Sequence, residues 1–285
     1  MKIGITAASS HYGTAVIKHL LELGTDAKDI VALGRTPEKL AQFNEQGIEG
    51  RHFDYDADLT GLLDDIDRLL FIPTAATSGR VEENTRVIEA AEKDGVQELI
   101  YLSFIGATDF PDDPLTPDHA ETEALLADSK MRTLSLRSGF YAENVLGAGE
   151  GYVAGGVFPS TAQDGKISVV GRDDLALAGA KLLLAEELPI GVMTFAGKAY
   201  TKAEIAQALS EAAGSEVKPL ELSEEDYRAT LMQFGMPAEV ADVFTAVDVS
   251  TRGGALYSDS HELADVLGRD PKTFAELAKE WADNR

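Results

Sequence analysis

The chain has 285 residues, of which 44% are hydrophobic and 26% are charged, a composition typical of a folded globular protein. Its formal net charge of −24 disfavours contact with the phosphate backbone of nucleic acids. The absence of cysteine excludes disulfides, thiolate catalysis and cysteine-ligated metal sites. Because no apolar run reaches the ~18 residues of a membrane span and no signal peptide is recognisable, we expect a cytoplasmic protein that contacts neither membranes nor nucleic acid.

The first half of the sequence alternates between apolar, strand-like runs and helix-like segments. This order indicates parallel strands joined by right-handed crossovers, and strands that are apolar throughout indicate a sheet covered on both faces. The predicted fold is therefore α/β, a Rossmann-type doubly wound parallel sheet. We predict strands at 3–6, 29–34, 52–54, 69–72, 98–103 and 133–137, and helices at 14–23, from 37 onward, 83–94 and 118–127.

The second half has a different texture. Residues 147–165 contain many glycines and are predicted to form a long loop, and a capping box at Thr201–Glu204 predicts the start of a helix. We predict a Rossmann domain at 1–150, continued by about 166–186, and a smaller, mostly helical lobe at 187–285 with loop 151–165. Other predicted elements are strands at 167–170 and 217–222, and helices at 172–184, from 223, at 237–247 and at 271–281.

The stretch GITAASSHYG, residues 4–13, occupies the place of a dinucleotide-binding glycine turn. Gly13 retains the glycine that lets helix and strand pack closely, whereas Ala7 and Ser10 replace the other two. Ala7 costs little if its φ is negative. The Ser10 side chain either obstructs the phosphate or donates a hydrogen bond to it. Because backbone N–H groups still bind phosphate at the start of a helix, we predict a pyrophosphate site formed by Ala8, Ser9, Ser10, His11, Tyr12 and Gly13.

Further cofactor contacts are predicted at the ends of the other strands. The second strand ends in Arg35, which suits the 2′-phosphate of NADP, whereas an acid there would bind the ribose of NAD. The alternative is a solvated arginine. Asp54 follows the third strand, near the expected adenine, or else it caps the following loop. The ends of the fourth and fifth strands face the nicotinamide half in such sheets, which adds Pro73, Thr74, Ser103 and Phe104 to the predicted site.

The absence of one pair of catalytic residues limits the reactions that this protein could catalyse. None of the eight tyrosines has a lysine four residues later, so the Tyr-x-x-x-Lys acid of ordinary short-chain dehydrogenases is absent, and the expected helix offers His119 and Glu123 instead. Hydride transfer to an acceptor that needs no strong acid requires less of the protein, because the cofactor delivers hydride and water can supply the proton. The candidate catalytic donors are Tyr141, Asn144 and His119, although Tyr141 could simply line the cleft and His119 could be structural.

Other reaction classes lack their signatures. The sequence contains neither a Gly-x-Ser-x-Gly elbow nor a Walker loop. Four aspartates, Asp109, Asp112, Asp113 and Asp118, lie in a proline-rich stretch and are interpreted as solvated turn residues. No metal site is predicted.

The segments TAASSHYG, VALGRTPEKL, FDYD, LLFIPT, YLSFIGA, HAETEALLADS, LRSGFYAEN and GRDDLA, in this order, resemble the NmrA-like family of atypical short-chain dehydrogenases/reductases. The resemblance covers nearly the whole chain and is strongest to the branch of type 2 NAD(P)H:quinone oxidoreductases and triphenylmethane reductases. It implies an NADPH-binding Rossmann domain and a small lobe that forms the substrate cleft. It also implies that His11 and Tyr12 flank the pyrophosphate, that Arg35 selects NADP, and that Asn144 lies near the nicotinamide. The family usually carries TGATGxLG at the turn, from which Ala7 and Ser10 depart.

The sequence therefore predicts an NADPH-dependent oxidoreductase that transfers hydride to a quinone or a similar conjugated small molecule, as a monomer or homodimer. The alternative is a non-catalytic regulatory protein that senses NADP(H), for which NmrA itself is the family precedent.

Overall fold

The computed structural model describes residues 1–74, 79–110 and 113–285. They form two compact units. The first comprises Met1–Phe104, Asp118–Arg137 and Asp173–Met193, and the second comprises Ile105–Pro117, Ser138–Arg172 and Thr194–Arg285. Residues 138–150 thus group with the second unit, whereas the predicted boundary at 150 assigned them to the Rossmann domain. Within the described ranges no helix is long and apolar enough to cross a membrane.

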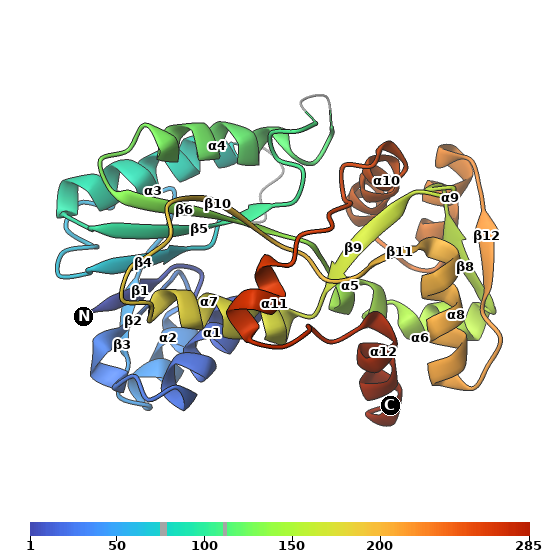
Figure 1. The fold of residues 1–285 in the computed structure, drawn as a ribbon, viewed down its shortest axis with the longest axis horizontal. Coiled ribbons are helices and arrows are strands. Elements are labelled where there is room, and N and C mark those ends of the chain that lie inside the picture. The colour runs from blue at the N-terminus through green and yellow to red at the C-terminus, as the bar shows by residue number, and fades with distance from the viewer. Residues whose placement is uncertain (75–78, 111–112) are drawn as a thin grey trace. The chain divides into compact units, whose positions relative to one another are not determined.

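A seven-stranded sheet forms the centre of the first unit (Figure 1). The strand order β10-β6-β5-β4-β1-β2-β3 is that of a doubly wound fold, and the pairings from β3 through β5 are parallel, which confirms the predicted class. The strands are β1 (Ile3–Ile5), β2 (Ile30–Gly34), β3 (Glu49–His52), β4 (Arg68–Phe71), β5 (Glu98–Phe104), β6 (Arg132–Ser138) and β10 (Gly191–Phe195).

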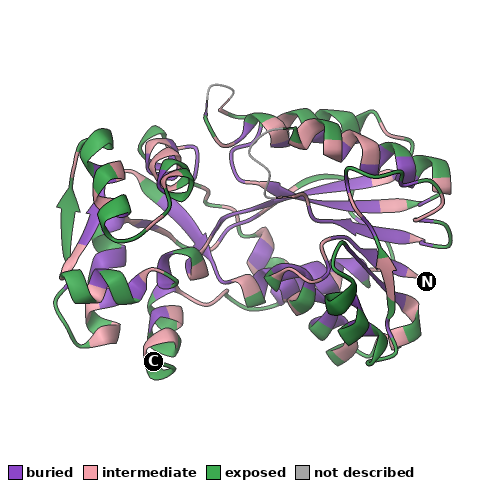
Figure 2. Cartoon of the chain, turned by 180° about the vertical axis from the view of Figure 1, so that it is seen from behind, coloured by how far each residue is buried: buried purple, intermediate pink, exposed green. Residues whose placement is uncertain are grey.

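Helices cover both faces of this sheet. One face carries α1 (His11–Glu22), α2 (Pro37–Asn44) and α7 (Arg172–Leu183), and the other carries α3 (Arg80–Asp94) and α4 (Pro117–Ala127), while a short 3₁₀ helix, η1 (Ala27–Asp29), precedes β2 (Figure 1). Every residue of β1, β2 and β4 is consequently buried (Figure 2). This burial explains why these strands are apolar except for Arg68, the first residue of β4.

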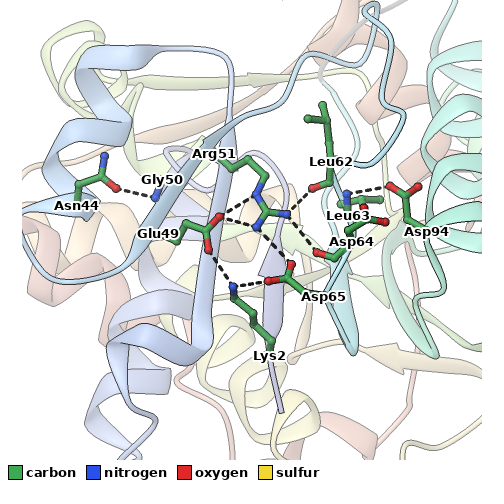
Figure 3. Close-up of polar contacts among 10 residues, drawn as sticks. All are labelled: Lys2, Asn44, Glu49, Gly50, Arg51, Leu62, Leu63, Asp64, Asp65 and Asp94. Carbon is green, nitrogen blue, oxygen red and sulfur yellow. Dashed lines mark hydrogen bonds and ion pairs between the residues drawn. The ribbon is translucent and has the colours of Figure 1, made fainter.

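The edge strand β3 differs from the prediction. It spans Glu49–His52 and so begins three residues before the predicted 52–54. The prediction missed this strand because its residues are polar and it pairs with β2 through backbone hydrogen bonds. Charged side chains cover this edge (Figure 3). Lys2 Nζ donates to Glu49 Oε2 at 2.9 Å and to Asp65 Oδ2 at 2.6 Å, and Arg51 Nε donates to Glu49 Oε1 at 3.0 Å. Such charges hinder the pairing of an open edge with another chain.

The second unit contains two small sheets and seven helices among its described residues. One sheet has the order β11-β9-β7 and the other pairs β12 with β8. The predicted capping box is confirmed, because Thr201 Oγ1 accepts from Glu204 N at 3.2 Å and Glu204 Oε2 accepts from Thr201 N at 2.7 Å. The elements are β7 (Phe140–Tyr141), α5 (Ala142–Leu146), α6 (Gly149–Gly155), β8 (Val157–Ser160), β9 (Lys166–Val170), β11 (Ala199–Thr201), α8 (Lys202–Ala213), β12 (Lys218–Glu221), α9 (Glu224–Gln233), α10 (Ala238–Gly253), α11 (Glu262–Leu267) and α12 (Phe274–Asp283).

The prediction of a long loop over 147–165 is wrong. This segment forms α6 and β8, and its glycines serve close packing and helix termination. A Cβ on Gly149 would lie 2.6 Å from Trp281 Cζ2, and Gly156 ends α6 with a φ of 67°. The glycines therefore mark close contact with α12 and a helix end, which local composition cannot distinguish from a loop.

Arg68 joins the start of β4 to the end of α7. Its Nη1 donates to the carbonyls of Leu183 at 2.8 Å and Ala185 at 2.9 Å, and its guanidinium pairs with the Glu98 carboxylate. Only 2% of Arg68 is exposed. The buried Arg68 guanidinium thus donates to the last carbonyls of α7, a helix that comes much later in the sequence than β4.

We predict that Arg68→Met lowers the free energy of unfolding by about 3–5 kcal/mol, because it leaves the α7 carbonyls without their buried donor and removes a buried cation from Glu98, which keeps only its pair with Arg132 among the described residues. Urea denaturation measures the loss. Lys18→Met, which removes an exposed pair with Glu22 on α1, is the control and should cost less than about 1 kcal/mol. Equal losses in the two variants would contradict this role of Arg68.

Candidate functional site

The turn between β1 and α1 is fixed by the close approach of Gly13. A Cβ at this position would lie 2.7 Å from Ala7 O and 2.9 Å from Ala8 Cα, so no larger residue fits. This confirms the packing role predicted for Gly13. Ala8 N donates to Leu33 O at 3.0 Å, which ties the turn to β2. The start of α1 is therefore held directly beyond the end of β1.

We expected Ala7 to replace glycine at little cost if its φ were negative, but the φ of Ala7 is positive. Its φ is 45°, in the left-handed region, and its carbonyl accepts from Ser10 N at 2.8 Å. The tight turn that brings α1 onto β1 imposes this conformation. An L-residue pays roughly 1–2 kcal/mol there, a cost that glycine avoids.

Ser10 has ordinary extended backbone, with φ −71° and ψ 162°, and is the N-cap of α1. Its Oγ accepts from Gly13 N at 3.0 Å. The side chain therefore folds back over the helix terminus and occupies one of the donors that an anion would use. The Ser10 hydroxyl accepts in this bond and does not use its own proton in it, so both interpretations of Ser10, as obstacle or as donor to the phosphate, remain predictions.

Two cations follow β2. Arg35 comes directly after the strand, Lys39 lies in α2, and both are exposed. Among the described residues, no acidic side chain pairs with either of them, in a chain that contains 49 acidic residues. Asp54, beyond β3, is half-buried, and its Oδ1 accepts from Asp56 N at 3.3 Å, so it does cap its loop.

The ends of β4 and β5 are rigidly held. Ile72 N donates to Thr6 Oγ1 at 2.8 Å and Tyr55 Oη donates to Ile72 O at 2.7 Å, contacts that the sequence did not reveal. Beyond them, Pro73 and Thr74 are half-buried, and Thr74 bonds the Glu83 carboxylate. The parallel strands thus bring the turn, Arg35, Asp54, Pro73–Thr74 and Ser103–Phe104 to one edge of the sheet.

At the end of β5, α4 carries an ion pair where short-chain dehydrogenases carry their lysine. Glu123 Oε1 accepts from Ser103 Oγ at 2.6 Å and from Arg137 Nε at 2.9 Å, and its Oε2 accepts from Arg137 Nη2 at 2.6 Å. All three residues are buried. The pair fixes Ser103 and adds no net charge, so it cannot lower the pKa of a neighbouring acid as a lysine would.

His119, one turn before Glu123, is 9% exposed, and its Nδ1 lies 2.9 Å from Tyr101 Oη. Burial, aided by the positive charge of Arg80, lowers the pKa of His119 to about 3. The imidazolium is therefore absent at neutral pH, and the only proton this side chain presents is the N–H of a neutral ring.

Tyr141 and Asn144 belong to the second unit. Tyr141 precedes α5 with the Arg172 guanidinium 5.2 Å from its ring centroid, and burial raises its pKa to about 12. Its hydroxyl therefore stays protonated and can donate a hydrogen bond. Asn144 is exposed on α5.

The predicted turn aspartates are only partly as expected. Asp113 is buried rather than solvated, and its Oδ1 accepts from Leu115 N at 2.9 Å. Asp112 lies outside the described residues. The part of the chain that the structure describes contains no group of three residues able to hold a metal ion.

A doubly wound sheet with a helix start beyond its first strand and cations beyond its second defines a dinucleotide-binding fold. Comparison with known proteins agrees with this class. The model of the NAD(P)H-binding family matches residues 7–186. Quinone oxidoreductase 2 of Escherichia coli (strain K12) is 35% identical over 277 residues, which cover 96% of each chain.

Two solved structures are similar over almost their whole length. The NADPH-dependent quinone oxidoreductase of Escherichia coli complexed with NADPH has a TM-score of 0.92 at 34% identity, covering 98% of this chain and 99% of the other. The triphenylmethane reductase of Citrobacter sp. complexed with NADP(H) has a TM-score of 0.91 at 26% identity, with the same coverage. The chain belongs to the NmrA-like family of NAD(P)H-binding proteins, among NAD(P)H-dependent oxidoreductases.

We predict that Ala7→Gly raises the free energy of unfolding by about 1 kcal/mol, because glycine adopts a φ of 45° without the clash of a Cβ. Urea denaturation at neutral pH measures the gain. Ala8→Gly, at a buried neighbour with no positive φ, is the control and should destabilise the protein. A loss of stability in Ala7→Gly would show that the left-handed turn is not strained.

We also predict a pH dependence of stability that depends on His119. Its pKa is about 3 when folded, against an ordinary value of 6.5, so the unfolded chain binds the additional proton between these values. Stability must rise with pH across this window and fall on acidification, with a slope of up to about 1.4 kcal/mol per pH unit.

Unfolding measured from pH 5 to 6.5 in wild type and His119→Gln tests this, because most carboxylates titrate below that range. The variant should show the shallower slope. His261→Gln, at an exposed histidine, is the control. Parallel slopes for wild type and His119→Gln would contradict the depressed pKa.

Proposed function

We propose that this protein is an NADPH-dependent reductase that transfers hydride to a quinone or a similar conjugated acceptor. The observation that supports NADPH as the cofactor is a pair of exposed cations after β2, Arg35 and Lys39. In the described part of the chain no acidic side chain forms an ion pair with either of them. In a protein with a net charge of −24, unpaired cations at this strand end suit the additional phosphate of NADPH.

The remainder of the cradle fits a dinucleotide. Gly13 leaves room for no side chain between helix and turn, and the first turn of α1 presents backbone N–H groups beyond the strand end. When bound, the cofactor supplies the hydride. The protein's share is to bind the pyrophosphate and the 2′-phosphate, to hold the ends of β4 and β5 rigid, and to place hydrogen-bond donors near the acceptor.

The residues of the α4 helix support this class of acceptor. Glu123 is neutralised by Arg137, and His119 has no proton to release as an acid at neutral pH. A carbonyl that becomes an alkoxide requires a strong acid. A quinone that becomes a hydroquinone anion requires only hydrogen-bond donors, because its charge is delocalised and water completes protonation.

The test is fluorescence titration with NADPH, followed by NADPH oxidation in the presence of a simple benzoquinone. We expect saturable binding and quinone-dependent turnover. No binding at millimolar NADPH would exclude the proposal. The similar triphenylmethane reductase of Citrobacter sp. makes a triphenylmethane dye a useful second substrate.

A second candidate is a regulatory protein that binds NADP(H) without turnover. The self-capping Ser10 favours it, because its Oγ occupies Gly13 N, a donor that a phosphate could otherwise use. Saturable NADPH binding with no oxidation across quinones and dyes would favour this alternative over the reductase.

We predict that Arg35→Ala weakens NADPH binding at least tenfold while NADH binding changes little, because only NADPH carries the phosphate that the guanidinium would pair with. Dissociation constants from nucleotide fluorescence measure both. Lys28→Ala, an exposed lysine paired with Asp26, controls for the loss of one positive charge. Equal losses for the two nucleotides would show that Arg35 does not read the 2′-phosphate.

We predict that Ser10→Gly tightens NADPH binding about tenfold, because it frees Gly13 N, to which Ser10 Oγ now binds, and clears the path of the pyrophosphate. The same titration measures the change. Ser10→Ala separates the two effects, since it removes the hydroxyl and keeps the Cβ. Weaker binding in both variants would mean that the hydroxyl donates to the phosphate.

A further inference from the structure

A chain of hydrogen bonds runs from α4 through α3 and β5 to His119, and its direction can be deduced from one fixed acceptor. Thr122 Oγ1 lies 2.7 Å from the carbonyl of Asp118, which can only accept. The single hydroxyl proton of Thr122 is therefore committed to that carbonyl. It follows that Thr122 Oγ1 can only accept from its other neighbours, Asn84 and Tyr101.

The amide of Asn84 must accordingly present its nitrogen to this site. Asn84 Nδ2 lies 2.9 Å from Thr122 Oγ1 and 3.4 Å from Tyr101 Oη, and donates to both. Because an amide N–H cannot accept, the Tyr101 hydroxyl proton must be directed to another neighbour. Thr122 also lies beside this hydroxyl but already accepts from Asn84, so we assign the proton to the partner that remains. That partner is His119 Nδ1, at 2.9 Å. The direction is thus set step by step from Thr122 through Asn84 and Tyr101 to His119.

A neutral imidazole that accepts at Nδ1 carries its proton on Nε2. Burial keeps the ring neutral, since it lowers the pKa of His119 to about 3. In the described part of the chain no partner accepts from Nε2, although the residue is nine-tenths buried. Its ring centroid lies 6.0 Å from that of Phe104, at the end of β5.

We propose that the relay Thr122–Asn84–Tyr101 holds His119 as the neutral Nε2–H tautomer, and that this N–H donates a hydrogen bond to the acceptor as it takes up hydride. The second part rests on the proposed function. Hydride from the cofactor reduces the quinone to the hydroquinone monoanion and leaves oxidised NADP, and a proton from water completes the hydroquinone. His119 stabilises the negative oxygen and keeps its own proton, which is how a neutral imidazole acts as an electrophile.

Asn84 and Tyr101 are positioning residues in this scheme. Tyr101→Phe removes only the hydroxyl and retains a ring that packs 5.3 Å from Phe71 and 5.9 Å from His119, centroid to centroid. Its effect on His119 therefore separates the relay from aromatic packing.

The tautomer is tested first, without any substrate. Nitrogen-15 NMR of histidine-labelled protein at pH 7 resolves five histidines, and His119→Gln assigns the signal. We expect a protonated Nε2 and an unprotonated, hydrogen-bonded Nδ1 in wild type, and loss of this pattern in Tyr101→Phe. A protonated Nδ1 in wild type would overturn the relay whatever the enzyme does.

The donor role is tested second, with NADPH and benzoquinone. We expect His119→Gln to lower kcat about 100-fold with an unchanged dissociation constant for NADPH, and Tyr101→Phe to lower kcat less, also without a change in NADPH binding. His261→Gln is the matched control and should match wild type. Wild-type kcat and KM in His119→Gln, with the predicted tautomer present, would overturn the donor role alone. Absence of NADPH binding or turnover in wild type would overturn the proposed function and with it the donor role, and would leave the relay to be decided by the spectra.

Discussion

The contact on which the first unit depends is the approach of α1 to the turn after β1 at Gly13. A side chain there would collide with the Ala7 carbonyl at 2.7 Å, so the helix can begin beyond the strand end only because this position has none. The same approach forces Ala7 into the left-handed region and makes Ser10 the N-cap. Gly13 thus determines where the N–H groups of α1 point. Because Gly13 is retained, the turn accommodates Ala7 and Ser10 in place of the other two glycines.

Electrostatics impose a second constraint, because a chain with a net charge of −24 repels an anionic cofactor at long range. The structure offsets this locally. Many cations elsewhere form ion pairs, such as Lys2 with Glu49 and Arg68 with Glu98. Arg35 and Lys39 at the end of β2 have no acidic partner among the described residues. Leaving two charges unpaired beside a helix start concentrates the positive potential where an anion would bind.

Much of the sheet could be predicted because buried strands such as β1 and β2 are apolar throughout. In the second unit, the start of α8 could be predicted from its capping box, Thr201 with Glu204. The errors share one cause, which is that backbone and long-range packing leave no local pattern. The polar β3 forms by edge pairing, and the glycines of 147–165 pack against α12. The positive φ of Ala7 depends on the close approach of Gly13, which comes later in the sequence. The sequence alone predicted Arg35 and the α4 residues His119 and Glu123 as candidates. It did not predict the partners Arg137, Tyr101 and Asn84, because these come from separate elements.

The replacement of Tyr-x-x-x-Lys by His119 and Glu123 changes more than two side chains. A lysine in that place needs a nearby hydroxyl to activate, whereas Glu123 needs a cation, which Arg137 supplies from β6 while Ser103 is held from β5. With the charge cancelled, nothing near His119 favours its protonation, and burial makes the ring neutral. A site of this kind can donate hydrogen bonds but cannot release protons near neutral pH. That property favours acceptors whose reduced form is a stabilised anion, and it is the physical link between the α4 sequence and the proposed quinone chemistry.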